Sequence, residues 1–441
     1  MPEVRRTGAG PAPHRLLLEA GVTAPRGWKA AGVHGGIKRR RPDVALLVSE
    51  QPAWAVATYT RNRVQAAPLQ VTRALLGGEG GWLGAVAVNS GNANACTGEE
   101  GLARARRMQA HAAAAVGLPP ERVAIASTGV IGVQLPEDPV ARGLERAAAT
   151  LGAGPVADEA FARAIQTTDT TLKQVAVEVE VAPGERVRVG GAAKGSGMIH
   201  PDMGTMLAFL TSDAELGDAG RARLPAAWRR VVERSFNRVT VDGDTSTNDM
   251  AIFLVNGAAG VRVDDLPEVA REGAEPEPEA GPGSRWARWL AAVEAVARHL
   301  ARAIAADGEG ASRLIEVEAR GLQSEAEAAA VARTVAGSSL VKAAVHGGDP
   351  NWGRVLAAAG RATVAGRPVV FDPERAELSI GGCLLYRGGE PLWEREAEAA
   401  EAMRRPEVRI ELVLGEGPGS ATAWGCDLSA EYVRINGSYR S

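Results

Sequence analysis

The stretch from Lys194 to Phe209 constrains this chain most, because it sets a Gly-rich turn and a hydroxyl residue directly before an apolar run. The glycines permit a tight turn, and Pro201 biases His200 towards an extended backbone. The run after Thr205 has the length and composition of a buried strand. A cut before Thr205 would free an α-amine with a pKa of ~7.7–8.0, which could act as the base for the Thr205 hydroxyl. A plain Gly-rich turn leading into a core strand explains the local pattern equally well.

The composition narrows the class of protein. Of the 441 residues, 45% are hydrophobic and 23% are charged, which is ordinary for a globular protein and predicts two or three domains. The net charge of −3 gives no reason to expect nucleic acid or an anionic membrane as a partner. No run resembles a signal peptide or a membrane span, so we expect a cytoplasmic protein. Cys96, Cys383 and Cys426 show no CxxC spacing, so neither a disulfide framework nor a zinc site is predicted.

Strand and helix patterns alternate along the chain, which predicts an α/β or α+β fold. Thr97 and Glu100 have the spacing of a capping box, and Pro225 suits a first helical turn. Strands are predicted at 43–49, 53–60, 83–89, 123–127, 174–181, 314–319, 339–345, 368–371, 376–385 and 408–414. Helices are predicted after Thr97 and at 138–150, 158–166, 225–235, 286–306, 325–335 and 393–404.

Several predicted strands and helices end in turns of small polar residues. Thr128 and Gly129 follow a strand, where a hydroxyl and backbone N–H groups could stabilise the oxyanion of an acyl transfer. Glu309 lies in a Gly-flanked turn between a helix and a strand, which could direct its carboxylate into a cleft or simply cap the helix. Asp349 suits a helix start, and we expect Trp352 to pack under the site.

Two acidic segments invite other interpretations. Asp242, Asp244 and Asp249 recur in one loop, but the EF-hand spacing and its terminal Glu are missing, so no metal role is predicted. The segment 263–284 is rich in Pro, Gly and Glu and is predicted to be an exposed insertion.

Taken in order, these segments resemble the bifunctional ornithine acetyltransferase / N-acetylglutamate synthase family, the glutamate N-acetyltransferases of arginine biosynthesis. The family pattern K-G-x-G-M-I-x-P-x-M-A-T-M-L matches from Lys194, with Gly204 where Ala is usual. The family's D-G-E-G-A-T-K segment matches around Glu309, and its Y-V-x-I-N-x-x-Y-R-T ending matches with Ser441 in place of Thr. The resemblance runs from about Gly21 to Ser441, apart from the insertion.

The resemblance implies a fold and an assembly. The fold would be an α/β (α+β) layered sandwich of two lobes, that of a self-processing N-terminal-nucleophile enzyme. A cut between Gly204 and Thr205 would give an α chain, 1–204, as the N-terminal lobe with the oxyanion residues. The β chain, 205–441, would begin with the nucleophile and carry the insertion. Two α and two β chains would form a heterotetramer.

The resemblance also implies a reaction, in which an acetyl group passes from N-acetyl-L-ornithine to L-glutamate through an acetyl-Thr205 intermediate. Thr205 would be the nucleophile, with Thr128 and Gly129 as the oxyanion hole. The substrates would be bound by Thr168, Lys194, Thr205, Glu309, Asn436 and Ser441. No metal or cofactor is expected, and whether acetyl-CoA also serves as a donor stays open.

Two other functions remain open from the residues alone. One is a self-processing N-terminal-nucleophile amidohydrolase or aminopeptidase, which would pass the acyl group to water. The other is a non-catalytic amino-acid-binding protein. A Ser-His-Asp hydrolase is disfavoured, because the sequence contains no G-x-S-x-G nucleophile elbow.

Overall fold

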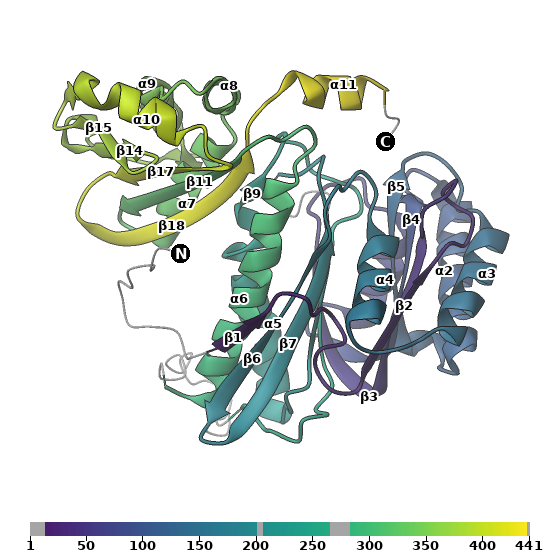
Figure 1. Ribbon diagram of the computed structural model, residues 1–441. Helices are drawn as coiled ribbons and strands as arrows, with labels where there is room; N and C mark the ends of the chain where they lie inside the picture. Colours follow the sequence, from purple (N-terminus) through teal and green to yellow (C-terminus); the bar gives the residue numbers. More distant parts are fainter. Residues whose placement is uncertain (1–13, 201–205, 265–282, 439–441) are drawn as a thin grey trace.

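The computed structural model describes residues 14–200, 206–264 and 283–438 of the chain. Two lobes are visible, each built on its own β-sheet with helices packed against it (Figure 1). The expected α/β layered architecture of two lobes is therefore confirmed.

The larger lobe is built on a nine-stranded sheet of order β1-β6-β7-β8-β10-β3-β4-β5, with β2 paired to β3. The pairs β8–β10 and β4–β5 are parallel, and the other pairs are antiparallel. Its strands are β1 (His14–Leu17), β2 (Trp28–Val33), β3 (Val44–Tyr59), β4 (Gly81–Asn92), β5 (Val123–Val130), β6 (Lys173–Ala182), β7 (Glu185–Lys194), β8 (Leu207–Ser212) and β10 (Met250–Val255).

Helices cover both faces of this sheet. One face carries α5 (Asp218–Glu233) and α6 (Arg285–Ala306), and the other carries α1 (Ala67–Leu76) and α4 (Pro155–Ile165). Helices α2 (Gly98–Val116) and α3 (Glu137–Ala149) pack with β4 and β5 in a further cluster.

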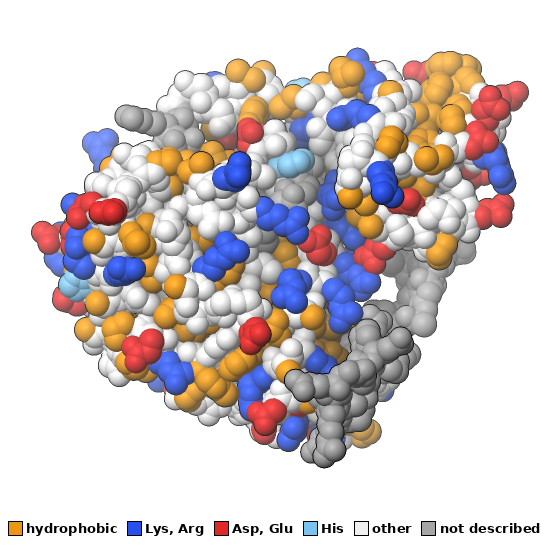
Figure 2. All heavy atoms as spheres, turned by 180° about the vertical axis from the view of Figure 1, so that it is seen from behind, with side chains coloured by type: hydrophobic (Ala, Val, Ile, Leu, Met, Phe, Trp, Pro, Cys, Tyr) orange, Lys and Arg blue, Asp and Glu red, His pale blue; other side chains and the backbone are white. Residues whose placement is uncertain are grey.

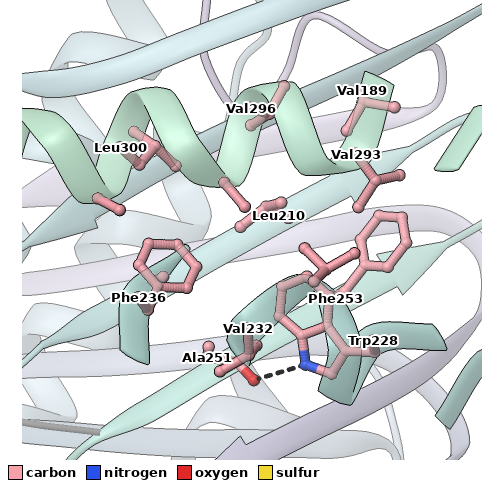
Figure 3. Packing of buried hydrophobic residues seen from close by; sticks show 14 of the residues in the cluster. Val189, Leu210, Trp228, Val232, Phe236, Ala251, Phe253, Val293, Val296 and Leu300 are labelled. Atoms are coloured by element: carbon pink, nitrogen blue, oxygen red, sulfur yellow. Dashed lines mark hydrogen bonds between the residues drawn. The ribbon is translucent and has the colours of Figure 1, made fainter. Parts of the chain in front are cut away.

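The central strands separate two hydrophobic cores. Phe253 of β10 packs with α5 and α6, whereas its neighbours Ile252 and Leu254 pack in the core that contains α4. This alternation follows from the two-residue period of a strand. Figure 3 shows the first core, where Trp228 of α5 lies against Phe253 and donates to the Ala251 carbonyl over 3.2 Å. Both faces of the central strands are thus covered by apolar cores. Polar functional groups are therefore expected at the strand ends.

The smaller lobe contains a seven-stranded sheet of order β16-β15-β14-β17-β11-β18-β9. Trp352 stacks on Tyr386 and touches Trp393 in this lobe, so the expectation that it packs under the site is wrong. The strands are β9 (Val239–Thr240), β11 (Leu314–Gly321), β14 (Glu377–Ile380), β15 (Cys383–Arg387), β16 (Glu390–Pro391), β17 (Glu407–Val413) and β18 (Gly417–Cys426). The helices are α7 (Glu325–Ala336), α8 (Ser339–Gly347), α9 (Trp352–Ala359) and α10 (Glu396–Ala402), and β12 (Thr363–Val364) pairs with β13 (Arg367–Pro368).

The lobes are joined by shared packing and by charge. β9, which follows α5 in the chain, pairs with β18 of the smaller sheet, and Trp424 of β18 packs in the core of the larger lobe. Arg234 lies 2.8 Å from Glu325 of α7. Figure 2 views the molecule from the side opposite to that of Figure 1. On this side, Lys and Arg side chains gather across the middle, with fewer Asp and Glu among them. Exposed ion pairs contribute little each, so we expect the buried packing of residues such as Trp424 to matter more for the junction.

The predicted division at residue 204 does not coincide with the division between the lobes. β8 and β10 both follow residue 204, yet they lie between β7 and β3 inside the larger sheet. The segment 1–204 is therefore not a lobe by itself.

Two predicted strands are wrong: of residues 368–371 only Pro368 belongs to a strand, and residues 339–345 are helical. Residues 339–345 belong to α8, and Gly348, directly after the helix, has the left-handed conformation. Val341, Ala344 and Val345 have the spacing of one helix face, and the apolar character of the run hid that period. The side chain of Lys342 is also buried there and donates to the Cys426 carbonyl.

Strand boundaries differ in two further places. Residues 43–49 and 53–60 belong to the single long strand β3, which has a register shift between Val48 and Ala53. Residues 376–385 instead contain a hairpin, β14 and β15.

One predicted cap and one predicted helix start are also wrong, although α2 does begin directly after Thr97. The Thr97 hydroxyl donates to Asn94 Oδ1 over 2.8 Å and does not cap α2. Pro225 lies inside α5, because the helix begins seven residues earlier at Asp218. There the distant Asp264 carboxylate accepts the Gly220 N–H over 3.0 Å, which is an N-terminal partner that local sequence cannot reveal.

The predicted insertion 263–284 lies mostly outside the described residues, since 265–282 are not described. At its start, Val263 and Asp264 are buried, so they are not part of an exposed segment. At its end, Ser284 accepts the Ala287 N–H over 3.1 Å and caps α6.

Across the described ranges, no single helix is long and apolar enough to cross a membrane, although the bent pair α7–α8 passes the same test as a pair. Both helices pack in the core of the smaller lobe.

Candidate active site

A cavity of about 220 Å³ lies where β5, β7, the turn after α6 and the C-terminal helix α11 (Ala430–Ser438) meet. Every predicted site residue that the structure describes lines it, although they come from five separate segments. These residues are Thr128, Gly129, Thr168, Lys194, Glu309 and Asn436. Gly204, Thr205 and Ser441 lie outside the described residues.

The cavity wall also contains residues that the sequence analysis did not select. They come mainly from the turn after Lys194 and from the loop after β9. They are Ile131, Thr167, Gly197, Met198, Asp242, Asp244, Ser246, Thr247, Asn248 and Tyr432.

Thr128 and Gly129 are placed by the parallel pairing of β4 and β5. Gly91 of β4 lies opposite Gly129, and a Cβ on Gly129 would lie 2.3 Å from the Gly91 carbonyl carbon. The φ of Gly129 is +132°, a conformation that L side chains rarely adopt. Only glycine fits here, and the Thr128 hydroxyl is held beside it at the end of a buried strand.

Lys194 brings a buried cation to the same point. Its side chain is 2% exposed, and Nζ donates to Thr128 Oγ1 over 3.4 Å. Burial lowers the pKa of Lys194, while Asp169 acts in the opposite direction. An ammonium group can only donate, so the Thr128 hydroxyl proton stays free to donate to another oxygen. The pair therefore presents a positive, hydrogen-bonding surface to a developing oxyanion.

A buried ionic network fixes these groups from behind. Lys173 Nζ lies 2.7 Å from Asp169 and 2.5 Å from Asp307, which follows α6. Asp169 also accepts the Gly195 N–H over 2.7 Å. Burial would raise the pKa of Asp169, but Lys173 and Lys194 outweigh it and hold the pKa well below its usual range. The segment around Thr168, the turn after Lys194 and the end of α6 are thus held together.

Ser196 connects two of the predicted substrate residues. Its hydroxyl lies 2.6 Å from the Thr168 hydroxyl, and its carbonyl accepts the Glu309 N–H over 2.8 Å. Gly197 leaves room for the carboxylate, because a Cβ there would lie 2.4 Å from Glu309 Oε2. Glu309 therefore reaches the cavity through a turn that tolerates no side chain at residue 197.

The acidic loop after β9 supports the site. Asp242 accepts the backbone N–H groups of Met198 and Ile199 over 2.6 and 2.9 Å, and burial raises its pKa. The Tyr432 hydroxyl of α11 donates to the same carboxylate over 3.3 Å. The loop positions the turn that follows Lys194, and over the part of the chain that the structure describes no group of three or more metal-ligating side chains occurs.

The C-terminal helix closes one side of the cavity by polar contacts. α11 has no buried residue, and Asn436 Nδ2 donates to Glu309 Oε2 over 2.8 Å. Glu309 and Asn436, both predicted as substrate residues, are thus in direct contact. Sequence reasoning missed Asp169 and Asp242 as supports, although Asp169 adjoins the predicted Thr168 and Asp242 had been considered as a metal ligand.

The combination suits acyl transfer to or from an amino acid. The Thr128 hydroxyl can stabilise an oxyanion, while Lys194 and Glu309 supply opposite charges for a zwitterion. The predicted nucleophile, Thr205, is not among the described residues.

Comparison with known proteins matches the chain to one family over most of its length. The model of the ArgJ family matches residues 29–441. "Arginine biosynthesis bifunctional protein ArgJ" of Symbiobacterium thermophilum is 50% identical over 96% of this chain and 99% of its own length. The protein of the same name from Thermus thermophilus is 48% identical over 95% and 99%. A crystal structure of ornithine acetyltransferase complexed with ornithine, from Mycobacterium tuberculosis, is 41% identical, with a TM-score of 0.40, over 43% of this chain and 98% of that chain.

Proposed function

The chain belongs to the ArgJ family, and we propose that the cavity described above carries out the family's acetyl transfer through an ester on Thr205. The chain is an enzyme of arginine biosynthesis, an ornithine acetyltransferase that passes the acetyl group of N-acetyl-L-ornithine to L-glutamate. The observation that supports the proposed site is the convergence of five separate segments on one cavity.

The first proposed step is self-cleavage. The Thr205 hydroxyl attacks the Gly204 carbonyl carbon, and the peptide bond gives way to an ester on Thr205 Oγ1. Water then hydrolyses this ester, which leaves a carboxyl group on Gly204 and a free α-amine on Thr205. The support is the match to the family pattern at Lys194, since residues 201–205 are not described.

The cleaved enzyme then takes up the acetyl group. The Thr205 oxygen attacks the acetyl carbonyl of N-acetylornithine while its proton passes to its own α-amine. The Thr128 hydroxyl and the Gly129 N–H stabilise the tetrahedral oxyanion. Collapse breaks the amide bond, the ammonium returns its proton to the leaving amine, and ornithine departs.

Glutamate completes the cycle. Its free amine attacks the acetyl-Thr205 ester, the same donors hold the second oxyanion, and N-acetylglutamate leaves as the Thr205 hydroxyl reforms. Both substrates are amino acids, so Lys194 and Glu309 can pair with their carboxylate and ammonium groups. Thr168, Asn436 and Ser441 add hydrogen bonds in this proposal.

We further propose that no cofactor takes part and that acetyl-CoA can replace N-acetylornithine as donor, which fits the word "bifunctional" in the names of the relatives. The cleaved pieces would assemble as two α and two β chains in the cytoplasm. Strands from both sides of residue 204 share one sheet, which supports pieces that stay together after cleavage.

The decisive experiment replaces Thr205. Purified wild-type protein should give two pieces of roughly 204 and 237 residues on denaturing mass analysis, the second beginning with Thr205, as a single intramolecular cut requires. Thr205→Ala should stay intact and form no N-acetylglutamate, whereas Thr205→Ser, which keeps the hydroxyl, should still be cut.

Two results would contradict the proposal. One is cleavage of Thr205→Ala at the same bond. The other is release of acetate from N-acetylornithine at an equal rate with and without glutamate, which would indicate an amidohydrolase.

A further inference from the structure

The connection between β2 and β3 carries consecutive cations to which the reaction above assigns no role. They are Lys38, Arg39, Arg40 and Arg41, and nowhere else in the sequence do even three Lys or Arg residues follow one another. The three arginines are exposed. We call the segment 38–41 the basic loop.

A buried carboxylate fixes the backbone around the basic loop. Asp43 is 0% exposed, and its carboxylate accepts the Gly35 N–H over 2.5 Å. It also accepts the N–H groups of Gly36 and Lys38 over 3.2 and 2.7 Å. The Lys38 ammonium in turn donates to the Pro42 carbonyl over 2.9 Å. The loop is therefore held in one shape before a ligand arrives, and a preorganised site loses less freedom on binding.

The basic loop adjoins the wall of the active-site cavity. Lys38 Nζ donates to the Gln166 carbonyl over 2.5 Å. The Arg41 guanidinium donates over 3.4 Å to the carbonyl of Thr167, which lines the cavity. The loop thus contacts the back of one wall segment while its exposed arginines lie outside the cavity.

The charges of the loop and of the cavity act on each other. Burial lowers the pKa of Lys38 to about 8, and the Asp43 carboxylate acts in the opposite direction. The ammonium of Lys194, which lines the cavity, and the Arg41 guanidinium lower this pKa further. A region of positive charge therefore runs from the basic loop to the cavity.

No ion pair balances this charge. Among the described residues, no carboxylate forms an ion pair with any of the cations of the basic loop. Arginines elsewhere on the surface do have such partners: Arg107 lies 2.5 Å from Glu137, and Arg234 lies 2.8 Å from Glu325. The guanidinium groups of the basic loop are therefore available to an anionic ligand.

A rigid group of arginines beside an acyl-transfer cavity suits a phosphorylated acyl donor. Guanidinium groups match phosphate oxygens with paired hydrogen bonds. Neither N-acetylornithine nor glutamate contains phosphate, whereas acetyl-CoA carries its phosphate groups at the end far from its acetyl group. Pockets for drug-sized ligands span ~300–1,000 Å³, so the nucleotide of this larger molecule cannot enter a cavity of about 220 Å³. It has to bind on the surface beside the cavity.

Resting on the proposed function, we propose that the basic loop binds the phosphate groups of acetyl-CoA while the acetyl thioester enters the cavity. The Thr205 oxygen then attacks the thioester carbonyl carbon, and the C–S bond breaks as the C–O bond of the new ester remains. The hydroxyl proton passes through the α-amine to the departing thiolate, so CoA leaves as the free thiol. The basic loop touches no reacting atom and determines which donor is accepted.

The first test measures the binding of CoA by calorimetry at low ionic strength. Arg39→Glu/Arg40→Glu reverses two exposed charges of the loop. Arg404→Glu/Arg405→Glu is the matched control, because it makes the same change at consecutive exposed arginines of the smaller lobe that do not line the cavity. We expect the Kd for CoA to rise about 10-fold or more in the loop variant, since charge-assisted hydrogen bonds are lost, and to change little in the control.

The second test compares the two acetyl donors in enzyme whose cleavage has been verified by mass. In the loop variant, kcat/KM for acetyl-CoA should fall with the affinity for CoA, while kcat/KM for N-acetylornithine should be kept. Arg39→Lys/Arg40→Lys retains the charge and should recover part of the loss. In the wild type, added salt should raise KM for acetyl-CoA more than KM for N-acetylornithine.

Several results would overturn the proposal. They are a wild type that does not bind CoA, equal CoA affinity in wild type and loop variant, an equal loss with both donors, and displacement of CoA by inorganic phosphate at the same concentration. If the variants do not fold, a wild-type KM for acetyl-CoA that is independent of salt contradicts it. Binding of CoA requires no reaction at Thr205, so failure of the proposed function would show separately, as acetyl transfer by Thr205→Ala.

Discussion

At the scale of single residues, the site depends on where side chains are absent as much as on where they are present. Because Gly129 has no side chain, its backbone can lie against that of Gly91, next to Thr128. Gly197 likewise leaves room for Glu309. The functional side chains are then fixed by buried partners such as Asp169 and Ser196.

Thr128→Ala tests the oxyanion role directly. The Lys194 ammonium donates to the Thr128 oxygen, which leaves the hydroxyl proton for the oxyanion. Removing one such donor typically costs ~10²–10³ in kcat, so turnover should fall by that factor with little change in KM for N-acetylornithine. Steady-state kinetics on protein with verified cleavage provide the measurement. An unchanged kcat with a raised KM would mean that Thr128 binds substrate and transition state alike.

At the scale of elements, the ends of strands and helices decide what reaches the cavity. β5 and β7 end in Thr128–Gly129 and Lys194, and α6 ends before the turn that carries Glu309. α11 contributes Asn436 and Tyr432 without burying any residue. The buried part of the site therefore comes from the sheet, and the outer wall comes from a helix held by polar contacts.

Two consecutive helices of the smaller lobe offer a matched test of capping. Ser324 accepts the Glu327 N–H over 3.2 Å at the start of α7, whereas Ser338 makes no such bond at the start of α8. Ser324→Ala should therefore cost about 0.5–2 kcal/mol in the free energy of unfolding, while Ser338→Ala should cost clearly less. Denaturant unfolding measures both, and kcat should be unchanged in each because neither serine lines the cavity. Equal losses would show that the cap on α7 is not what Ser324 contributes.

At the scale of the whole molecule, chain order and spatial order are interleaved. β8 and β10 lie between β7 and β3, so a cut at residue 204 separates neighbours of one sheet. The buried cores on both faces of these strands would hold the two pieces together after cleavage.

The insertion gives a prediction at this scale. Deleting residues 272–282 should leave acetyl transfer and cleavage nearly unchanged, because loop-closure entropy varies slowly with loop length and this composition packs poorly. The anchors on either side, Asp264 at the start of α5 and Ser284 at the start of α6, are kept in this variant. Activity and thermal unfolding of the variant provide the measurement. Loss of transfer in a folded variant would assign the segment a role at the site.

The sequence alone predicted much of the α/β pattern, the family and the set of site residues, because these depend on periodicity and on local motifs. α6, β5 and β6 were predicted within a residue or a few at each end. Thr128, Lys194, Glu309 and Asn436 were selected from segments far apart in the chain, and all four line one cavity.

Other features depended on the tertiary structure, because they arise from contacts between distant segments. Asp264 determines where α5 begins, and the burial of Lys342 against Cys426 accompanies a helix at 339–347. Asp249 was considered only as a possible metal ligand. Nothing in the local sequence shows that it is buried and accepts a hydrogen bond from the Met206 N–H. Periodicity is a property of residues that are neighbours in the sequence. The partner of a buried charge depends instead on how strands from distant parts of the chain pack together.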